Sequence, residues 1–214
     1  RRKGQLIGGA DENEPDGCVA KYRAEQDTMP DPRAFVDPKE VRKMDKRAVF
    51  ITGTTGFVGA GLAVYYLRHG ATVFALCRGG DPTRVERALM SVDPNESWRS
   101  GALHVVPGDV TLDEVGLAKS WYDRLKGRID LFLHAAGHIR FEEEDPLNIE
   151  INYLGSRRMA QVAKELGRGR FFYISTAYVC GKSMGQIAEE NVPSSHPMHN
   201  NYEYSKILAE HAVQ

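Results

Sequence analysis

The sequence predicts an α/β fold with a doubly wound parallel sheet, and three observations support this class. Short apolar runs alternate with longer segments of helical periodicity. The first apolar run ends in glycines spaced for a tight strand-to-helix turn. The chain has 214 residues, of which 42% are hydrophobic and 27% charged, as in ordinary globular domains. This length accommodates one such domain and a tail.

Each strand is expected from an apolar run, because parallel strands covered on both faces are apolar throughout. The expected strands are 48–52, 71–77, 103–106, 129–134 and 170–175. The segments between them predict helices over 57–67, 82–90, 117–125, 148–166 and 202–213. Gly70 suits the C-terminal end of the first helix, and Asp81 suits an N-cap followed by Pro82 in the first turn of the second.

Residues 1–46 differ from the rest, since they are rich in charge, proline and glycine and their apolar residues are isolated. We interpret them as a charged linker or tail that is partly disordered. Residues 47–214 are then expected to form the α/β domain. The chain opens on Arg-Arg-Lys rather than Met, which suggests a piece of something longer.

Composition excludes several classes of partner and site. The formal net charge of −1 disfavours nucleic acid, and no apolar run is long enough for a membrane span. Three cysteines without close spacing favour a reducing, cytoplasmic location. The acidic run 142–145 is expected to be a solvated surface, and His134 and His138 fall across a strand end and a loop. We predict no metal site.

The glycines Gly53, Gly56 and Gly59 follow a predicted strand and open a predicted helix, which is the context that a dinucleotide-binding turn requires. Gly53 permits the tight turn, Gly56 lets the backbone approach a diphosphate, and Gly59 is expected to let the helix lie close to the sheet. The free N–H groups of the helix N-terminus would then face the phosphates.

The end of the second strand indicates which dinucleotide binds. Sites for NAD commonly place a carboxylate there, whereas this strand ends in Cys77-Arg78 and Asp81 comes only afterwards. A guanidinium suits a 2′-phosphate through paired hydrogen bonds. We therefore predict NADP(H) in preference to NAD(H), with Arg78 as the main contact and Arg84 as a second.

Tyr202 and Lys206 are four residues apart on a predicted helix and therefore share one face. An ammonium beside a phenol stabilises the phenolate, which suits the phenol for proton transfer. Tyr204 has no such partner, because position 208 is Leu.

Several sequence motifs together resemble those of one superfamily, the extended short-chain dehydrogenase/reductases with a Rossmann fold. They are Thr52–Gly59, Gly108-Asp109-Val110, His134-Ala-Ala-Gly137, Asn152, Ser175–Gly181 and Tyr202–Lys206. The resemblance implies that Thr176, Tyr202 and Lys206 are catalytic, with Ser175 as second choice for the hydroxyl. It implies cofactor contacts at Gly53, Thr55, Gly56, Phe57, Val58, Gly59, Arg78, Arg84, Asp109, Val110, Ala135, Ala136, Gly137, Asn152, Tyr202 and Lys206.

Within this superfamily the sequences of these motifs are similar to those of the thioester reductase and fatty acyl-CoA reductase branch. That likeness implies an NADPH-dependent reduction of an acyl thioester, bound to coenzyme A or to a carrier protein, to an aldehyde or alcohol. Two alternatives stay open. One is an NAD(P)-dependent sugar-nucleotide epimerase or dehydratase, and the other is a non-catalytic dinucleotide-binding module.

The resemblance also implies a missing part. Members of the superfamily continue past the Tyr-x-x-x-Lys helix with strands and a C-terminal region that form most of the substrate pocket, whereas this chain stops at Gln214. We therefore expect a further C-terminal segment or a partner chain, and we expect the isolated fragment to lack normal turnover.

Overall fold

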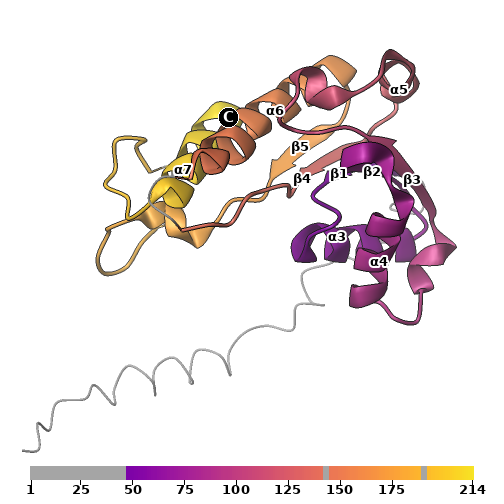
Figure 1. Cartoon of the computed structure of the whole chain (residues 1–214), viewed down its shortest axis with the longest axis horizontal. Helices are drawn as coiled ribbons and strands as arrows, with labels where there is room; N and C mark the ends of the chain where they lie inside the picture. Colours follow the sequence, from indigo (N-terminus) through magenta and orange to yellow (C-terminus); the bar gives the residue numbers. More distant parts are fainter. Residues whose placement is uncertain (1–46, 142–144, 189–191) are drawn as a thin grey trace, which may run out of the picture. The chain divides into compact units, whose positions relative to one another are not determined.

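The computed structural model describes residues 47–141, 145–188 and 192–214, so the tail predicted over 1–46 lies outside the described residues. A sheet of five parallel strands forms the centre, in the order β3-β2-β1-β4-β5. The connections run outward in both directions from β1, which confirms the doubly wound sheet (Figure 1). The strands are β1 (Ala48–Thr52), β2 (Thr72–Cys77), β3 (Ala102–Pro107), β4 (Leu131–His134) and β5 (Arg170–Tyr173).

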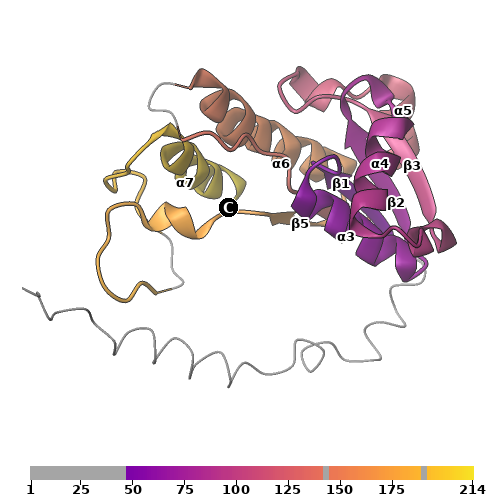
Figure 2. The same ribbon diagram turned by 60° about the horizontal axis from the view of Figure 1, so that its bottom comes forward.

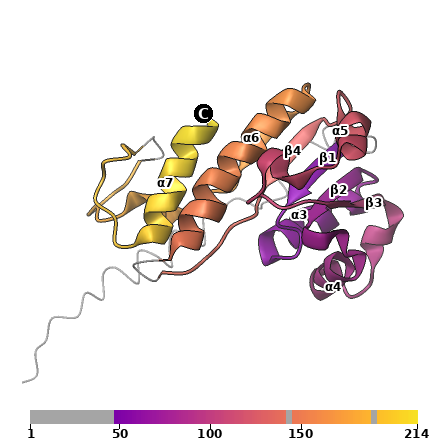
Figure 3. The ribbon, with the colours of Figure 1, turned by 45° about the horizontal axis from the view of Figure 1, so that its top comes forward.

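Helices cover both faces of the sheet. Figure 1 shows α3 and α4 on one face and α5 and α6 on the other, and Figure 3 shows α7 running beside α6. The α-helices are α3 (Phe57–Arg68), α4 (Pro82–Val92), α5 (Lys119–Leu125), α6 (Gly155–Leu166) and α7 (Asn201–Val213). Short 3₁₀ turns are η2 (Arg78–Gly80), η3 (Ser97–Ser100), η4 (Asp113–Gly116) and η6 (Ala177–Cys180).

Two apolar cores, one on each face, explain why the strands are apolar throughout. Alternate residues of β1 point to opposite faces, so Val49 and Ile51 join the core under α3 and α4. Phe50 joins the core under α6, where its ring centroid lies 5.9 Å from that of Phe132. Val49, Phe50 and Ile51 are fully buried.

The signals read at the helix ends act as expected. Gly70 has φ +74°, and the N–H groups of Gly70 and Ala71 donate to the carbonyls of Leu67 and Tyr66, a pattern typical of a glycine-terminated helix. The carboxylate of Asp81 accepts a hydrogen bond from the Thr83 N–H at 2.9 Å and caps α4.

The helix expected over 148–166 is two elements. A π-helical segment, η5 (Asn148–Leu154), precedes α6 without a break. Asn148 and Asn152 are both buried in η5, and their side chains hydrogen-bond each other at 3.2 Å. Single π turns within helices are frequent at functional sites, because the wider turn redirects side chains.

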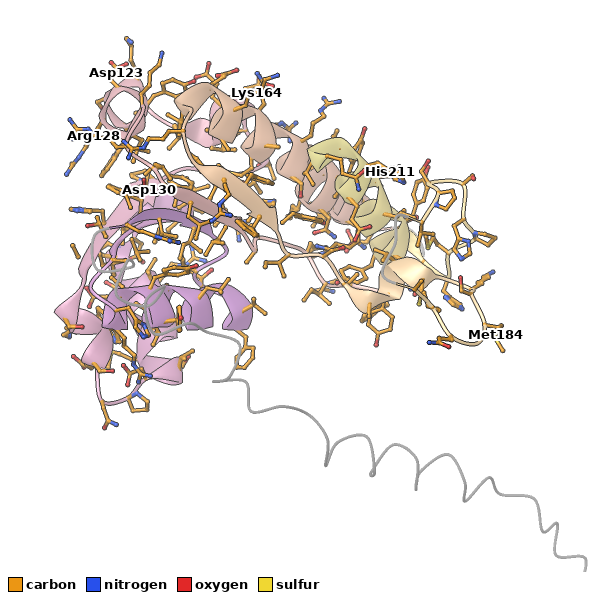
Figure 4. The ribbon with its side chains drawn as sticks, turned by 180° about the vertical axis from the view of Figure 1, so that it is seen from behind. Asp123, Arg128, Asp130, Lys164, Met184 and His211 are labelled. Carbon is orange, nitrogen blue, oxygen red and sulfur yellow. The ribbon has the colours of Figure 1, made fainter. Side chains whose placement is uncertain are left out.

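A long loop joins η6 to α7. Figure 2 shows its described parts extending away from the sheet before the chain returns to α7, and Figure 4 shows Met184 near the far end of this loop. Met184 is 92% exposed. Among the described residues, no helix combines the length and apolar character needed to cross a bilayer.

Candidate active site

A cleft of about 280 Å³ opens at the carboxyl ends of β1, β2 and β4, where the strand order reverses. Ligands of open α/β sheets bind at this position. We call it the strand-end cleft. Ten of the predicted cofactor residues line it together: Gly53, Thr55, Gly56, Arg78, Arg84, Asp109, Val110, Ala135, Ala136 and Gly137. Other predicted residues, namely Phe57, Val58, Gly59, Asn152, Tyr202, Lys206 and Thr176, lie outside its lining.

The glycine turn is built by two close approaches of the backbone. Gly53 has φ +76°, and a Cβ there would lie 2.6 Å from the carbonyl of Ala135. A Cβ on Gly59 would lie 2.2 Å from the carbonyl oxygen of Gly53. The sequence predicted that Gly59 is needed for close packing of the helix on the sheet. The contact that excludes a side chain at Gly59 instead comes from Gly53 in the turn itself, so that explanation is incomplete.

Gly56 differs from its two neighbours in the motif. A Cβ on Gly56 would meet only the Gly53 carbonyl oxygen, at 3.4 Å, and its φ of −100° suits any residue. The fold alone therefore does not require glycine at this position. The space beside Gly56 is open to the strand-end cleft, which fits close approach by a phosphate group.

The N-terminus of α3 can bind an anion. No side chain caps it, so the N–H groups of its first turn have no side-chain partner. Phe57 and Val58 at this end are 89% and 48% exposed. Free N–H groups and the helix dipole together favour negative charge here, which fits the diphosphate of a dinucleotide.

Two free guanidiniums line the same cleft. Arg78 follows β2 and Arg84 lies in α4, and both are exposed. Among the described residues, neither has a hydrogen-bond or ion-pair partner, and the Asp81 carboxylate is engaged in capping α4. Asp109 holds its own loop, since its Oδ1 accepts from both the N–H and the hydroxyl of Thr111. The β2 end of the cleft is therefore suited to a phosphate.

A buried chain of hydrogen bonds connects the glycine turn with η5. The Ala136 N–H donates to Thr52 Oγ1 at 3.1 Å, and Thr52 Oγ1 lies 2.7 Å from His134 Nδ1. His134 Nε2 lies 3.0 Å from Ser156 Oγ, which donates to the Asn152 carbonyl. Thr52 and His134 are directly opposite each other in the β1–β4 ladder.

All hydrogen bonds between Thr52 and Asn152 have the same donor-to-acceptor direction, fixed by the proton of Ser156. The Ser156 hydroxyl donates to the Asn152 carbonyl, so its oxygen accepts from His134 Nε2–H. With hydrogen on Nε2, His134 Nδ1 is the acceptor for the Thr52 hydroxyl. Complete burial, with a smaller contribution from Lys206, lowers the pKa of His134 to about 3. His134 is therefore a neutral structural histidine.

Asn152 links the loop after β4 with α7. Its Oδ1 accepts from the His138 N–H at 2.7 Å, and its Nδ2 donates to the His138 carbonyl at 2.9 Å. The same Nδ2 lies 3.0 Å from Ser205 Oγ, and Ser205 donates to the Tyr202 carbonyl. Asn152 thus holds the backbone of His138, which lines the strand-end cleft, and contacts α7, the helix that carries Tyr202 and Lys206.

Tyr202 and Lys206 are both buried on α7. The Tyr202 ring packs edge-on against Phe141, with centroids 5.2 Å apart. Lys206 Nζ donates to the Ile174 carbonyl at 2.7 Å and lies 4.2 Å from the centroid of the Tyr173 ring. Burial lowers the pKa of Lys206 to about 8, because its ammonium is desolvated. Among the described residues Nζ has one hydrogen-bond partner, so it keeps N–H donors for a ligand.

Thr176 lines a second cavity of about 820 Å³, bounded by β5, η6 and the C-terminal end of α7. We call it the β5 cavity. Thr176 Oγ1 accepts from the Tyr178 N–H at 3.3 Å and caps η6. Its hydroxyl proton has no acceptor in the part of the chain that the structure describes, so it can donate to a ligand. Ser175 also lines this cavity, and its buried Oγ has no partner among the described residues.

Six residues of the strand-end cleft were not among the predicted cofactor contacts, although three of them stand in the motifs named from the sequence: Thr52, Leu76, Cys77, Gly108, His138 and Ile151. Most of them end a strand or follow one, which is the signal that could have found them. Within the described ranges, no group of three or more His, Cys, Asp or Glu side chains is arranged to hold a metal ion. Residues 142–144 of the acidic run lie outside the described residues.

The family model described as male sterility protein, an NAD-binding family, matches residues 51–214. The chain belongs to this family. The match covers every strand-end cleft residue as well as Thr176, Tyr202 and Lys206.

Curated relatives of the chain include synthetases and fatty acyl-CoA reductases. Peramine synthetase A of Epichloe festucae is 28% identical over 174 residues, which cover 78% of this chain and 6% of the relative. A putative fatty acyl-CoA reductase of Drosophila melanogaster is 31% identical over 152 residues, covering 66% of this chain and 28% of the relative. The chain thus spans less than a third of either relative.

Among solved structures, the terminal R domain from the myxalamid PKS-NRPS biosynthetic pathway has a TM-score of 0.66 at 26% identity. It covers 78% of this chain, which spans 44% of that domain. UDP-glucuronic acid 4-epimerase from Bacillus cereus, in complex with NAD, has a TM-score of 0.55 at 19% identity, with 77% and 50% covered. The second likeness shows a shared fold alone.

Replacing Gly56 separates folding from ligand binding. We expect Gly56→Ala to lower the free energy of unfolding by no more than about 1 kcal/mol, since the new methyl group meets no tight contact and the cost comes from alanine being a poorer N-cap than glycine. It should weaken dinucleotide binding by about tenfold or more, because the methyl group occupies the space of a phosphate. Denaturant unfolding and fluorescence titration with NADPH and NADH measure the two effects.

Gly61→Ala is the matched control, because a Cβ at Gly61 meets nothing within 4 Å. It should stabilise the interior of α3 by about 0.5–1 kcal/mol and leave affinity unchanged. Equal affinities for Gly56→Ala and the parent chain would contradict a phosphate at Gly56.

The desolvated Lys206 predicts a pH dependence of stability. Its pKa of about 8 lies below the ordinary lysine value of 10.5, so the unfolded chain binds a proton that the folded chain lacks between these values. The free energy of unfolding should therefore rise with pH across this window. Between pH 7 and pH 10, the parent chain should gain about 2 kcal/mol relative to Lys206→Met, as measured by denaturant unfolding. Parallel pH profiles of the two proteins would show that Lys206 is not desolvated.

Proposed function

We propose that this chain is the cofactor-binding and proton-donating part of an NADPH-dependent reductase of acyl thioesters. The observation that carries the proposal is the strand-end cleft, which combines an uncapped helix N-terminus with two unpaired guanidiniums. The named relatives support the substrate class, because they include fatty acyl-CoA reductases and the R domain of a PKS-NRPS pathway. The thioester would be carried by coenzyme A or by a carrier protein.

Different residues of the cleft would bind different groups of the cofactor. The glycine turn and the N-terminus of α3 would hold the diphosphate, with Gly56 at the closest approach. Arg78 and Arg84 would hold the 2′-phosphate, since no carboxylate competes for them among the described residues. NADPH, when bound, supplies the hydride that reduces the thioester carbonyl.

Proton transfer falls to α7. As the carbonyl carbon accepts hydride, its oxygen takes up negative charge, and Tyr202 donates a proton to it. Thr176 donates a hydrogen bond to the same oxygen, since its Oγ1 accepts locally and leaves its proton free. The Lys206 ammonium would stabilise the phenolate that remains, and it would hold the nicotinamide ribose. Collapse of the hemithioacetal breaks the C–S bond and releases thiol and aldehyde. A second reduction would give the alcohol.

Tyr202→Phe tests the mechanism. We expect NADPH consumption with acyl-CoA or acyl-carrier substrates to fall by about 10²–10⁴-fold, the usual contribution of a general acid. The assay uses the complete protein that carries these residues. Tyr204→Phe is the matched control, because Tyr204 is 40% exposed on the same helix, and it should retain activity. Failure of the parent protein to reduce any thioester, or retention of activity by Tyr202→Phe, would contradict the proposal. Tightly retained NAD without net NADPH consumption would favour an epimerase or dehydratase.

Arg78→Ala tests the choice of cofactor. Loss of one charge-assisted contact should weaken NADPH binding by about 10- to 100-fold and leave NADH binding unchanged. Arg87→Ala is the control, since Arg87 is exposed on α4 but does not line the cleft. Fluorescence titration measures all four affinities. Equal NADPH affinities for Arg78→Ala and the parent would exclude Arg78 as the 2′-phosphate contact.

A further inference from the structure

His138 lines the strand-end cleft without a role in the mechanism above. Its side chain is 20% exposed, and it pairs with Asp145, whose side chain is 11% exposed. Such a pair inside a ligand cleft needs an explanation, because a partly buried polar ring is costly unless its atoms are engaged.

Both the ring and the backbone of His138 are fixed. Nε2 lies 2.7 Å from Asp145 Oδ2, and Asp145 Oδ1 accepts from the Leu147 N–H at 2.9 Å. The hydrogen bond from His138 lowers the pKa of Asp145, so the carboxylate is ionised and accepts the Nε2 proton. The Asn152 side chain holds the N–H and the carbonyl of His138 at the same time.

One ring nitrogen remains for a ligand. Among the described residues, Nδ1 of His138 has no hydrogen-bond partner. Since Nε2 donates its hydrogen bond to Asp145, the tautomer with hydrogen on Nε2 leaves a lone pair on Nδ1, which can accept a hydrogen bond. At metal sites a carboxylate commonly fixes one ring nitrogen of a histidine and leaves the other for the ligand, and the Asp145–His138 pair has the same form.

The strand order shows which part of a dinucleotide would meet His138. Along the sheet, β2, β1 and β4 are consecutive, and they end in Arg78, the glycine turn and the loop with His138. With the 2′-phosphate at Arg78 and the diphosphate at the glycine turn, the other ribose lies at the β4 end. Asn152 links His138 to Ser205, the neighbour of Lys206, so this end adjoins α7.

We propose that His138, oriented by Asp145, is a cofactor-binding residue whose Nδ1 accepts a hydrogen bond from a hydroxyl of the nicotinamide ribose. The inference rests on the dinucleotide-binding part of the proposed function and is independent of the acyl substrate.

The test compares two ligands that share only the adenosine half. NADPH contains both ribose units, whereas adenosine 2′,5′-bisphosphate lacks the nicotinamide ribose. We expect His138→Leu to weaken NADPH binding about fivefold, as for the loss of one hydrogen bond, and to leave binding of the bisphosphate unchanged. Asp145→Asn should show the same ligand dependence with a smaller loss. His138→Gln keeps a side-chain acceptor and should recover part of the affinity. Isothermal titration on the 214-residue chain gives all the dissociation constants.

Arg78→Ala serves as the opposite control, because it should weaken both ligands alike. Equal losses for both ligands in His138→Leu, or no loss for either, would overturn the assignment, and a merely structural His138–Asp145 pair gives one of these results. Failure of the parent chain to bind NADPH at all would overturn the proposed function itself, whereas normal NADPH binding with an unaffected His138→Leu variant overturns only this inference.

Discussion

The buried hydrogen-bond chain from Thr52 through His134 and Ser156 to Asn152 is the constraint on which the site depends. It joins the carboxyl ends of β1 and β4 to η5, and the Ala136 N–H that begins it belongs to the cleft wall. Each hydroxyl both donates and accepts, so removing one member leaves a buried polar group unpaired, at a cost of about 1–3 kcal/mol. Protonating His134 would break the same chain, which agrees with its strongly lowered pKa.

The π-helical start of the α6 segment is part of this constraint. Ser156 donates to the carbonyl of Asn152, four residues earlier, at the point where η5 gives way to α6. A side chain that bonds to the backbone in this way competes with the helical ladder and bends the helix. The side-chain amide of Asn152 hydrogen-bonds to His138 and Ser205 and is buried away from solvent. The irregular turn therefore places one buried amide between the cleft and α7.

The fold and most of the cleft could be predicted from the sequence, because strands, caps and the glycine turn are local patterns. Gly70 and Asp81, for example, act within a few residues of their own helix. The rest depends on contacts between distant residues. His134 meets Thr52 across 82 positions, and nothing in the spacing of these residues predicts that pairing. The π turn was missed because its apolar periodicity differs little from that of an α-helix over seven residues.

Two neighbouring residues of α7 connect the two cavities. Ser205 contacts Asn152 and thereby the support of the strand-end cleft, whereas Lys206 donates to the Ile174 carbonyl, two residues before Thr176 in the β5 cavity. Successive residues on a helix point about 100° apart, so one turn of α7 can be tied to both sides. A displacement of α7 would strain both contacts at once. The position of Tyr202 is therefore set jointly by contacts on the side of the strand-end cleft and on the side of Thr176, which is what its proposed role as proton donor needs.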